Sequence, residues 1–291
     1  NPDHLGALLY AGSCSLQEGS FEKARNYLIR YDTINPGFTP ALKMLAVIAL
    51  KNGKFKDVQQ YIRPVLAQEP NDVSSLNLLA AALMGDKQTP EGLDVLQQMV
   101  KLNPESADAR MKLGMGMIQQ GKIESGLNEL EASRKLDPDV LQTSLAIIDT
   151  YLRNNEKDRA LAAALTLLDT HPDSVIANAA LGTVYLSRQE NNKASQAFRD
   201  TLALDSDNVT ANRGLATLAV QAGQPEEAKT DYRKILQNLP GELSTSMNLA
   251  YLSALDGNVD EMKAVLEKTI EANPGSLLPR LALSRYYSRQ G

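Results

Sequence analysis

Few residues in the 291-residue chain have the types and spacing that catalysis or metal binding requires. The two histidines, His4 and His171, do not lie among cysteines or acids at the spacing of metal ligands. The single cysteine, Cys14, cannot form an intrachain disulfide, and we interpret it as a small helical residue rather than a reactive thiol. No glycine-rich phosphate loop and no HExxH or GxSxG motif occurs. The sequence therefore predicts no metal, no cofactor and no enzyme activity.

Two pairs of acidic residues could act as a general acid and a general base, namely Glu129 with Glu131 and Glu226 with Glu227. Carboxylates are common on solvated helix faces, and in the first turn of a helix they are stabilised by the helix dipole. We therefore interpret both pairs as ordinary surface residues.

The charge of the chain is nearly balanced. It has 30 lysines and arginines against 35 aspartates and glutamates, a net charge of −5, with both signs scattered along its length. This pattern does not fit a nucleic-acid partner, and no apolar run is long enough for a transmembrane helix. The first residues also lack the basic and apolar regions of a signal peptide.

A period of 34 residues organises the elements that would hold any functional side chain. Proline recurs at positions 2, 36, 70, 104, 138, 172, 240 and 274, and Ser206 occupies the remaining place in the series. A fixed repeat of this length is typical of a solenoid of helix pairs. The period gives eight full repeats, at 5–38, 39–72, 73–106, 107–140, 141–174, 175–208, 209–242 and 243–276, and a partial repeat at 277–291.

Each repeat packs only on its neighbours, so we expect residues 1–291 to form one solenoid domain. Asn1 and Pro2 fit the end of a preceding repeat, and 277–291 fits only the first helix of another. We therefore expect the chain to be part of a longer array.

Within each repeat the sequence predicts two amphipathic helices of about a dozen residues. Position 7 of the repeat is mostly large and apolar and position 8 is mostly small, as in Leu113 and Gly114. Position 20 is mostly small and position 24 mostly large and apolar. Glycine recurs at position 15, where a residue without Cβ can take the left-handed conformation that ends a helix; these glycines are Gly19, Gly53, Gly121, Gly223 and Gly257.

These columns, with proline at position 32, resemble the tetratricopeptide repeat over the whole chain. The resemblance implies an all-α fold, a right-handed superhelical solenoid of antiparallel helix pairs, whose first helices line a concave groove that binds a protein or peptide segment. The chain departs from the family at position 4, where tryptophan is frequent and this sequence has Leu8, Leu42, Leu76, Arg110, Ser144, Asn178, Asn212 and Ser246. The carboxylate clamp of the chaperone-binding members is not visible at positions 5 and 9.

If positions 5, 9 and 12 of the first helix face the groove as in that family, the predicted groove residues are Lys43, Val47, Leu50, Asn77, Ala81, Met84, Met111, Met115, Ile118, Leu145, Asp149, Arg213, Thr217 and Tyr251. The first half of this set is largely apolar, and an exposed apolar patch commonly marks a binding surface. The alternative is that packing buries position 12 and much of position 5. In the second half Thr183, Arg213, Thr217 and Arg285 would suit a polar or acidic ligand, or would be ordinary solvated residues.

Two segments, Gly19 to Lys54 and Leu136 to Ala164, also resemble the repeat lipoproteins of bacterial exosortase and exopolysaccharide systems, the PEP-CTERM group. That resemblance implies a periplasmic protein anchored by a lipid on a cysteine upstream of this chain, because Cys14 cannot be the anchor.

The functional hypothesis is therefore a non-catalytic scaffold that binds other proteins, in the assembly of envelope exopolysaccharide export. A general cytoplasmic adaptor or chaperone-like peptide-binding array is the alternative. Direct polysaccharide binding would require aromatic platforms in the groove, and Tyr251 is the only aromatic residue at positions 5 and 9.

Overall fold

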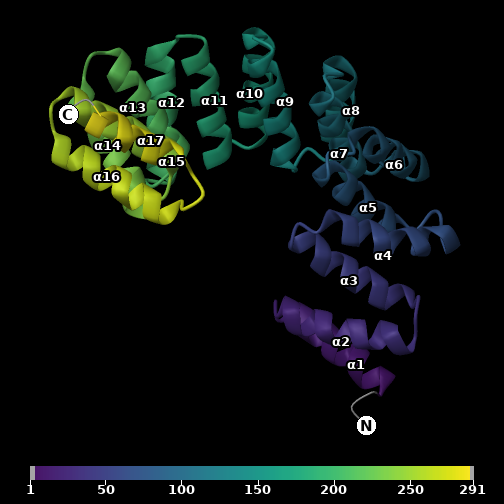
Figure 1. The fold of residues 1–291 in the computed structure, drawn as a ribbon. Coiled ribbons are helices and arrows are strands. Elements are labelled where there is room, and N and C mark those ends of the chain that lie inside the picture. Colours follow the sequence, from purple (N-terminus) through teal and green to yellow (C-terminus); the bar gives the residue numbers. More distant parts are fainter. Residues whose placement is uncertain (1–3, 289–291) are drawn as a thin grey trace. The chain divides into compact units, whose positions relative to one another are not determined.

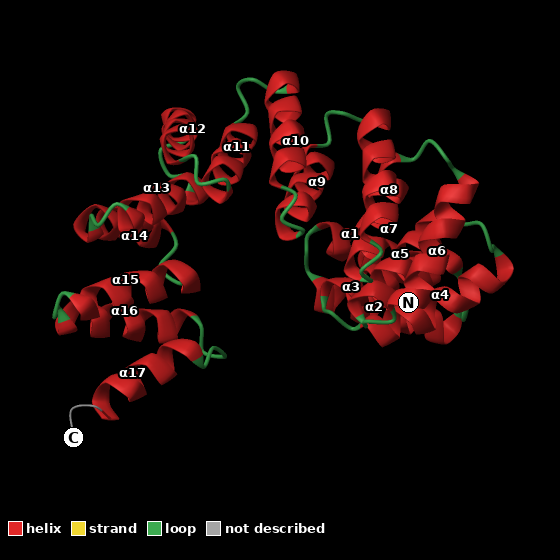
Figure 2. Cartoon of the chain, turned by 90° about the horizontal axis from the view of Figure 1, so that it is seen from above, coloured by secondary structure: helices red, strands yellow, loops and turns green. Residues whose placement is uncertain are grey.

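The computed structural model describes residues 4–288, and all 17 regular elements in this part of the chain are α-helices (Figures 1 and 2). The first helix of each full repeat has 13 residues and the second has 14, close to the predicted dozen. The helices are α1 (Leu5–Gln17), α2 (Phe21–Ile34), α3 (Thr39–Lys51), α4 (Phe55–Gln68), α5 (Val73–Gly85), α6 (Thr89–Leu102), α7 (Ala107–Gln119), α8 (Ile123–Leu136), α9 (Leu141–Arg153), α10 (Lys157–Thr170), α11 (Val175–Ser187), α12 (Asn191–Leu204), α13 (Val209–Gln221), α14 (Pro225–Asn238), α15 (Leu243–Leu255), α16 (Val259–Ala272) and α17 (Leu278–Ser288).

The chain divides into two compact units, one ending at Ala146 and one beginning at Ile147, and the boundary falls within α9. Unit 1 contains α1–α8, and unit 2 contains α10–α17. The single domain expected over 1–291 stays a prediction. The predicted partial repeat 277–291 contains α17, and its last three residues, like Asn1 and Pro2, lie outside the described residues.

Inside each unit the helices stack in chain order (Figure 1). The two helices of one repeat pack on each other, as α1 does on α2, and the second helix packs on the first helix of the next repeat, as α2 does on α3. First helices of successive repeats also contact each other, α1 with α3 and α3 with α5 in unit 1, and α11 with α13 in unit 2. The predicted all-α solenoid of antiparallel helix pairs is confirmed.

The turn between the two helices of a repeat always contains a left-handed residue at position 15. The five glycines predicted there have φ between 67° and 79°. In the repeats without glycine, Lys87, Asn155 and Gln189 take φ of 61°, 61° and 63°. The left-handed backbone conformation therefore occurs at position 15 both in glycine and in residues with a Cβ atom, for which it is less favourable.

The core of each unit is built from the predicted columns. Every residue at position 24 is buried, in the order Leu28, Ile62, Leu96, Leu130, Ala164, Phe198, Tyr232 and Leu266. The small residues at positions 8 and 20 let the two helices approach closely. A Cβ atom on Gly114 would lie 2.7 Å from the carbonyl oxygen of Gly126, so α7 and α8 touch backbone to backbone.

Position 4, where the chain departs from the family pattern, is occupied in two different ways. Leu8, Leu42 and Leu76 are buried apolar side chains. Three of the five polar residues instead donate a hydrogen bond to the carbonyl oxygen six residues earlier, in the loop that ends the previous repeat: Arg110 Nε to Pro104 at 2.8 Å, Asn178 Nδ2 to Pro172 at 3.5 Å and Asn212 Nδ2 to Ser206 at 3.3 Å. In six of the eight repeats, position 4 therefore holds either a buried apolar side chain or one that bonds to the preceding loop, and the exceptions are Ser144 and Ser246.

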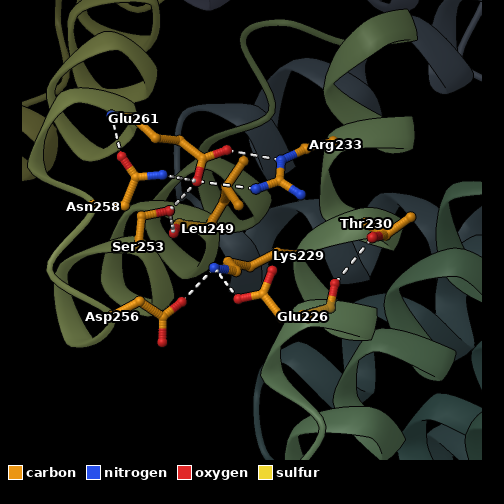
Figure 3. A network of polar contacts seen from close by, with 9 residues as sticks. All are labelled: Glu226, Lys229, Thr230, Arg233, Leu249, Ser253, Asp256, Asn258 and Glu261. Atoms are coloured by element: carbon orange, nitrogen blue, oxygen red, sulfur yellow. Dashed lines mark hydrogen bonds and ion pairs between the residues drawn. The ribbon is translucent and has the colours of Figure 1, made fainter.

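A polar network also joins the last two full repeats of unit 2 (Figure 3). The Arg233 guanidinium donates two hydrogen bonds to Glu261, Nε to Oε1 at 2.7 Å and Nη2 to Oε2 at 3.0 Å. Lys229 is buried between Asp256 and Glu226. Hydrogen bonds from Arg233 lower the pKa of Glu261, so this carboxylate is ionised and held in place.

Candidate binding surface

The predicted groove lysine, Lys43, is already paired. Its Nζ lies 2.8 Å from Oδ2 of Asp72, the residue that precedes α5. The same carboxylate accepts a hydrogen bond of 2.8 Å from the backbone N–H of Ser75 and so caps the helix. Burial acts to raise the pKa of Asp72, but hydrogen bonds from Lys43 and Ser75 outweigh it and lower the pKa. Lys43 is therefore largely neutralised within the chain.

Arg213 repeats this arrangement in unit 2. Its Nη2 lies 3.1 Å from Oε1 of Glu242, which precedes α15 and accepts a hydrogen bond of 2.6 Å from the backbone N–H of Thr245. Burial acts to raise the pKa of Glu242, but these contacts outweigh it and lower the pKa. In both units the basic residue lies 29 positions before the capping carboxylate. These two helix caps were not identified from the sequence, although an acidic residue just before an apolar helix commonly marks the N-terminus of that helix.

Asn77, the other polar residue predicted for the groove in unit 1, is also engaged. Its Oδ1 accepts a hydrogen bond of 2.8 Å from Lys112 Nζ, and Lys112 lies 2.7 Å from Asp108. These three polar side chains are therefore in contact through Lys112.

The position-12 residues Leu50, Met84 and Ile118 are half-buried against their own repeat. A Cβ atom on Gly92 would lie 2.9 Å from Met84 Sδ, and one on Gly126 would lie 2.6 Å from Ile118 Cγ1. Both side chains therefore cover the small residue at position 20 of the second helix. This is the packing that the alternative interpretation expected at position 12.

Among the predicted groove residues of unit 1, the most accessible apolar surface lies at position 9 of three successive first helices. Val47 is half-buried, Ala81 is exposed and Met115 is 42% exposed. We call these three residues the Met115 surface. Met111 at position 5 is only 9% exposed, and Leu145 is half-buried. Met111 thus contributes mainly to the core.

In unit 2 several of the polar side chains predicted to face a ligand already make contacts within the chain. The hydroxyls of Thr183 and Thr217 donate to the carbonyl oxygens of Ala179 and Arg213, each at 2.9 Å, and do not need a ligand. Asp149 is exposed and lies 2.8 Å from Arg153 on the same helix.

Tyr251 is the most exposed of the predicted residues in unit 2, at 64%. Leu255, one turn further along α15, is 65% exposed and was not predicted because it lies at position 13. Residues four apart lie on the same helix face, so α15 presents an exposed apolar pair.

The residues first considered for chemistry have structural contacts. His4 Nδ1 accepts a hydrogen bond of 3.2 Å from the backbone N–H of Ala7 and caps α1, and His171 Nδ1 lies 2.9 Å from the Thr170 hydroxyl. Glu129 lies 2.7 Å from Arg110, and Glu131 lies 2.6 Å from Arg134.

Among residues 4–288 no group of three or more histidine, cysteine, aspartate or glutamate residues is arranged to hold a metal ion. Over the same range, no helix combines the length and the apolar character needed to cross a bilayer.

Two tetratricopeptide repeat family profiles match the sequence. One matches residues 15–83, and the other matches residues 112–174, 145–209 and 179–242. Together they cover more than half of the chain. Comparison with curated protein sequences finds no significant match.

Several solved structures have a similar fold. A tetratricopeptide repeat protein from Parabacteroides merdae has a TM-score of 0.68 at 14% identity, over 85% of this chain and 98% of that one. Yeast Tom70 has a TM-score of 0.73 at 15% identity, over 94% of this chain and 58% of that one. The Cut9–Hcn1 hetero-tetramer of the APC/C has a TM-score of 0.57 at 10% identity, over 96% and 55%. At these identities the similarity shows the fold alone.

Proposed function

Because the chain belongs to the tetratricopeptide repeat family, we propose that it is a non-catalytic scaffold that binds a segment of another protein on its first helices. Arrays of such repeats present extended surfaces built from successive helices, which suits the binding of protein segments.

The observation that carries this proposal is the Met115 surface. Val47, Ala81 and Met115 occupy the same position of three successive first helices, and Ala81 and Met115 are exposed. The charged neighbours Lys43 and Lys112 are paired with Asp72 and Asp108. A partner can therefore cover the methionine without breaking a strong internal contact, and methionine adapts to apolar side chains of different shapes.

The test is capture of partners by the full chain from native extracts, with crosslinking and mass spectrometry. Met115→Glu places a charge on the surface and should abolish capture of the specific partner. Leu136→Glu is the matched control, because Leu136 is also 42% exposed but lies at the end of α8, a second helix. Equal capture by the wild type and Met115→Glu would contradict the assignment of the surface.

For the cellular setting we propose the assembly of envelope exopolysaccharide export, with the protein held in the bacterial periplasm by a lipid on an upstream cysteine. This setting rests on the resemblance of Gly19–Lys54 and Leu136–Ala164 to the PEP-CTERM lipoproteins. Capture from envelope and cytosolic extracts should be compared in parallel. Met115-dependent capture of an envelope biosynthesis protein would support the setting, and Met115-dependent capture of cytosolic proteins alone would exclude it.

A further inference from the structure

A cavity of about 460 Å³ lies where α14 meets α15 and α16 in unit 2. Its apolar wall is formed by Leu236 of α14, Pro240 of the following loop, Leu249 of α15 and Val265 of α16. A volume of this size, with apolar side chains and polar groups together in the wall, is typical of small-ligand sites.

A short side chain, Ser246 at position 4 of this repeat, lies beside the cavity. At the equivalent position Leu42 and Leu76 fill the junction between repeats, and Asn212 reaches the carbonyl oxygen of the preceding loop. Ser246 does neither, and both Ser246 and Pro240, whose carbonyl is the equivalent acceptor, line the cavity. At this junction, the side chain beside the cavity is therefore shorter than Leu42, Leu76 and Asn212 at the same position of other repeats.

Five of the nine residues that line the cavity are polar or charged, and they differ in which hydrogen bonds or ion pairs they already make. Arg233 and Glu261 on the wall satisfy each other through two hydrogen bonds (Figure 3). Lys268 of α16 is exposed, and no residue in the described part of the chain forms an ion pair with it. The hydroxyl of Ser246 is fully buried and has no hydrogen-bond partner among residues 4–288. The lining groups without a partner among the described residues are thus the Lys268 ammonium, the exposed Gln237 amide and the buried Ser246 hydroxyl.

We propose that this cavity binds a small amphipathic carboxylate, with its apolar body against Leu236, Leu249 and Val265 and its carboxylate near Lys268. An apolar body is favoured by the wall, because burying it removes apolar surface from water. An anion is favoured over a cation because the acidic group on the wall, Glu261, is already paired and Lys268 is not.

The same chemistry occurs in a free short-chain fatty acid and in a protein segment where an acidic residue follows leucine. This inference does not depend on the proposed scaffold function, since the cavity lies in unit 2 and the Met115 surface lies in unit 1.

The experiment is methyl-detected NMR of the full chain, titrated with hexanoate, hexanol and hexylamine, which share one apolar body and differ in charge. Hexanoate should shift the methyl signals of Leu236, Leu249 and Val265 and bind about tenfold more tightly than hexylamine. A parallel titration with the capped dipeptide acetyl-Leu-Asp-amide distinguishes the two sources: saturation by hexanoate alone indicates a small acid, and saturation by the dipeptide indicates a protein segment.

Three variants locate the site. Ser246→Leu introduces the residue that the chain itself has at positions 42 and 76, so it should fill the cavity and abolish binding without lowering the Tm. Ser246→Ala keeps the space and should keep binding. Lys268→Gln should weaken hexanoate about tenfold and leave hexanol unchanged, whereas Lys101→Gln, at an exposed lysine of unit 1, should change neither. Unchanged hexanoate binding by Ser246→Leu, or equal binding of all three probes, would overturn the proposal.

Discussion

At the scale of single residues, Asp231 is a buried acid at position 23, where Glu129 is the other acid and the remaining residues are apolar or aromatic: Tyr27, Tyr61, Val95, Ala163, Ala197 and Val265. The residue is only 9% exposed, and it lines a mainly polar pocket together with Arg199 and Lys234. Lys234 Nζ, 3.4 Å from Oδ1, is a distant partner on an exposed side chain. Burial is the main cause of the raised pKa of Asp231. The ionised carboxylate therefore destabilises the folded chain.

We expect Asp231→Val to raise the free energy of unfolding by about 1 kcal/mol at pH 7, because it removes a poorly paired buried charge. The raised pKa also determines how this gain in stability depends on pH. The penalty is full above the folded pKa and disappears below the unfolded pKa, where the aspartate is protonated in both states. The gain measured by urea unfolding should therefore shrink at about pH 3.5. An equal gain at both pH values would show that packing, not charge, is responsible.

Met111 and Met115 lie one turn apart on α7 but differ in burial, 9% against 42% exposed. Met111→Glu buries a charge and should lower the free energy of unfolding by about 2 kcal/mol or more. Met115→Glu should change it by less than about 0.5 kcal/mol. Urea unfolding of the two variants checks the difference, and similar losses in both would contradict the burial described here.

The sequence could predict the column of each of these residues but not its contacts. Position 5 holds a buried methionine at 111 and a paired lysine at 43, and nothing in the period distinguishes them. The pairing of Lys43 with Asp72 depends on side-chain conformations and on how closely successive repeats stack, and both are properties of the folded chain.

At the scale of elements, the turn at position 15 was predictable where it is glycine and not where it is another residue. The 34-residue period requires the same left-handed geometry in every repeat, and Lys87, Asn155 and Gln189 adopt it. For residues with a Cβ atom this conformation costs about 1 kcal/mol, and less for asparagine, whose short polar side chain tolerates it.

We expect Lys87→Gly and Gln189→Gly each to stabilise the chain by up to about 1 kcal/mol, and Asn155→Gly to stabilise it less. Gly53→Lys is the reverse control, because a Cβ atom there would meet no other atom within 4 Å and only the backbone conformation opposes it. It should destabilise by a similar amount. Thermal unfolding of the four variants ranks them by stability. A loss of stability in Lys87→Gly would show that the lysine side chain makes a stabilising contact in the wild type.

At the scale of the whole molecule, stability should pass from repeat to repeat through the contacts between neighbours. Gly126→Ala tests this in unit 1, because the added Cβ would lie 2.6 Å from both the Gly114 carbonyl oxygen and Ile118 Cγ1. Forcing α7 and α8 apart should cost about 1–3 kcal/mol. Hydrogen exchange should rise most in α7 and α8, then in α6, and least in α1 and α2. The exposed neighbour Ser125→Ala is the control, and a uniform rise throughout α1–α8 would indicate that unit 1 unfolds as one block.

The internal pairing of Lys43 with Asp72, and of Arg213 with Glu242, has a consequence for how fast a partner arrives. Opposite charges a few ångströms apart cancel beyond about 10 Å, roughly the screening length at 0.1 M salt, so these pairs create little field to guide an approaching protein. Encounter on the first helices should then be governed by diffusion and by the orientation of the two surfaces, at about 10⁵–10⁷ M⁻¹ s⁻¹. The association rate should change little with ionic strength.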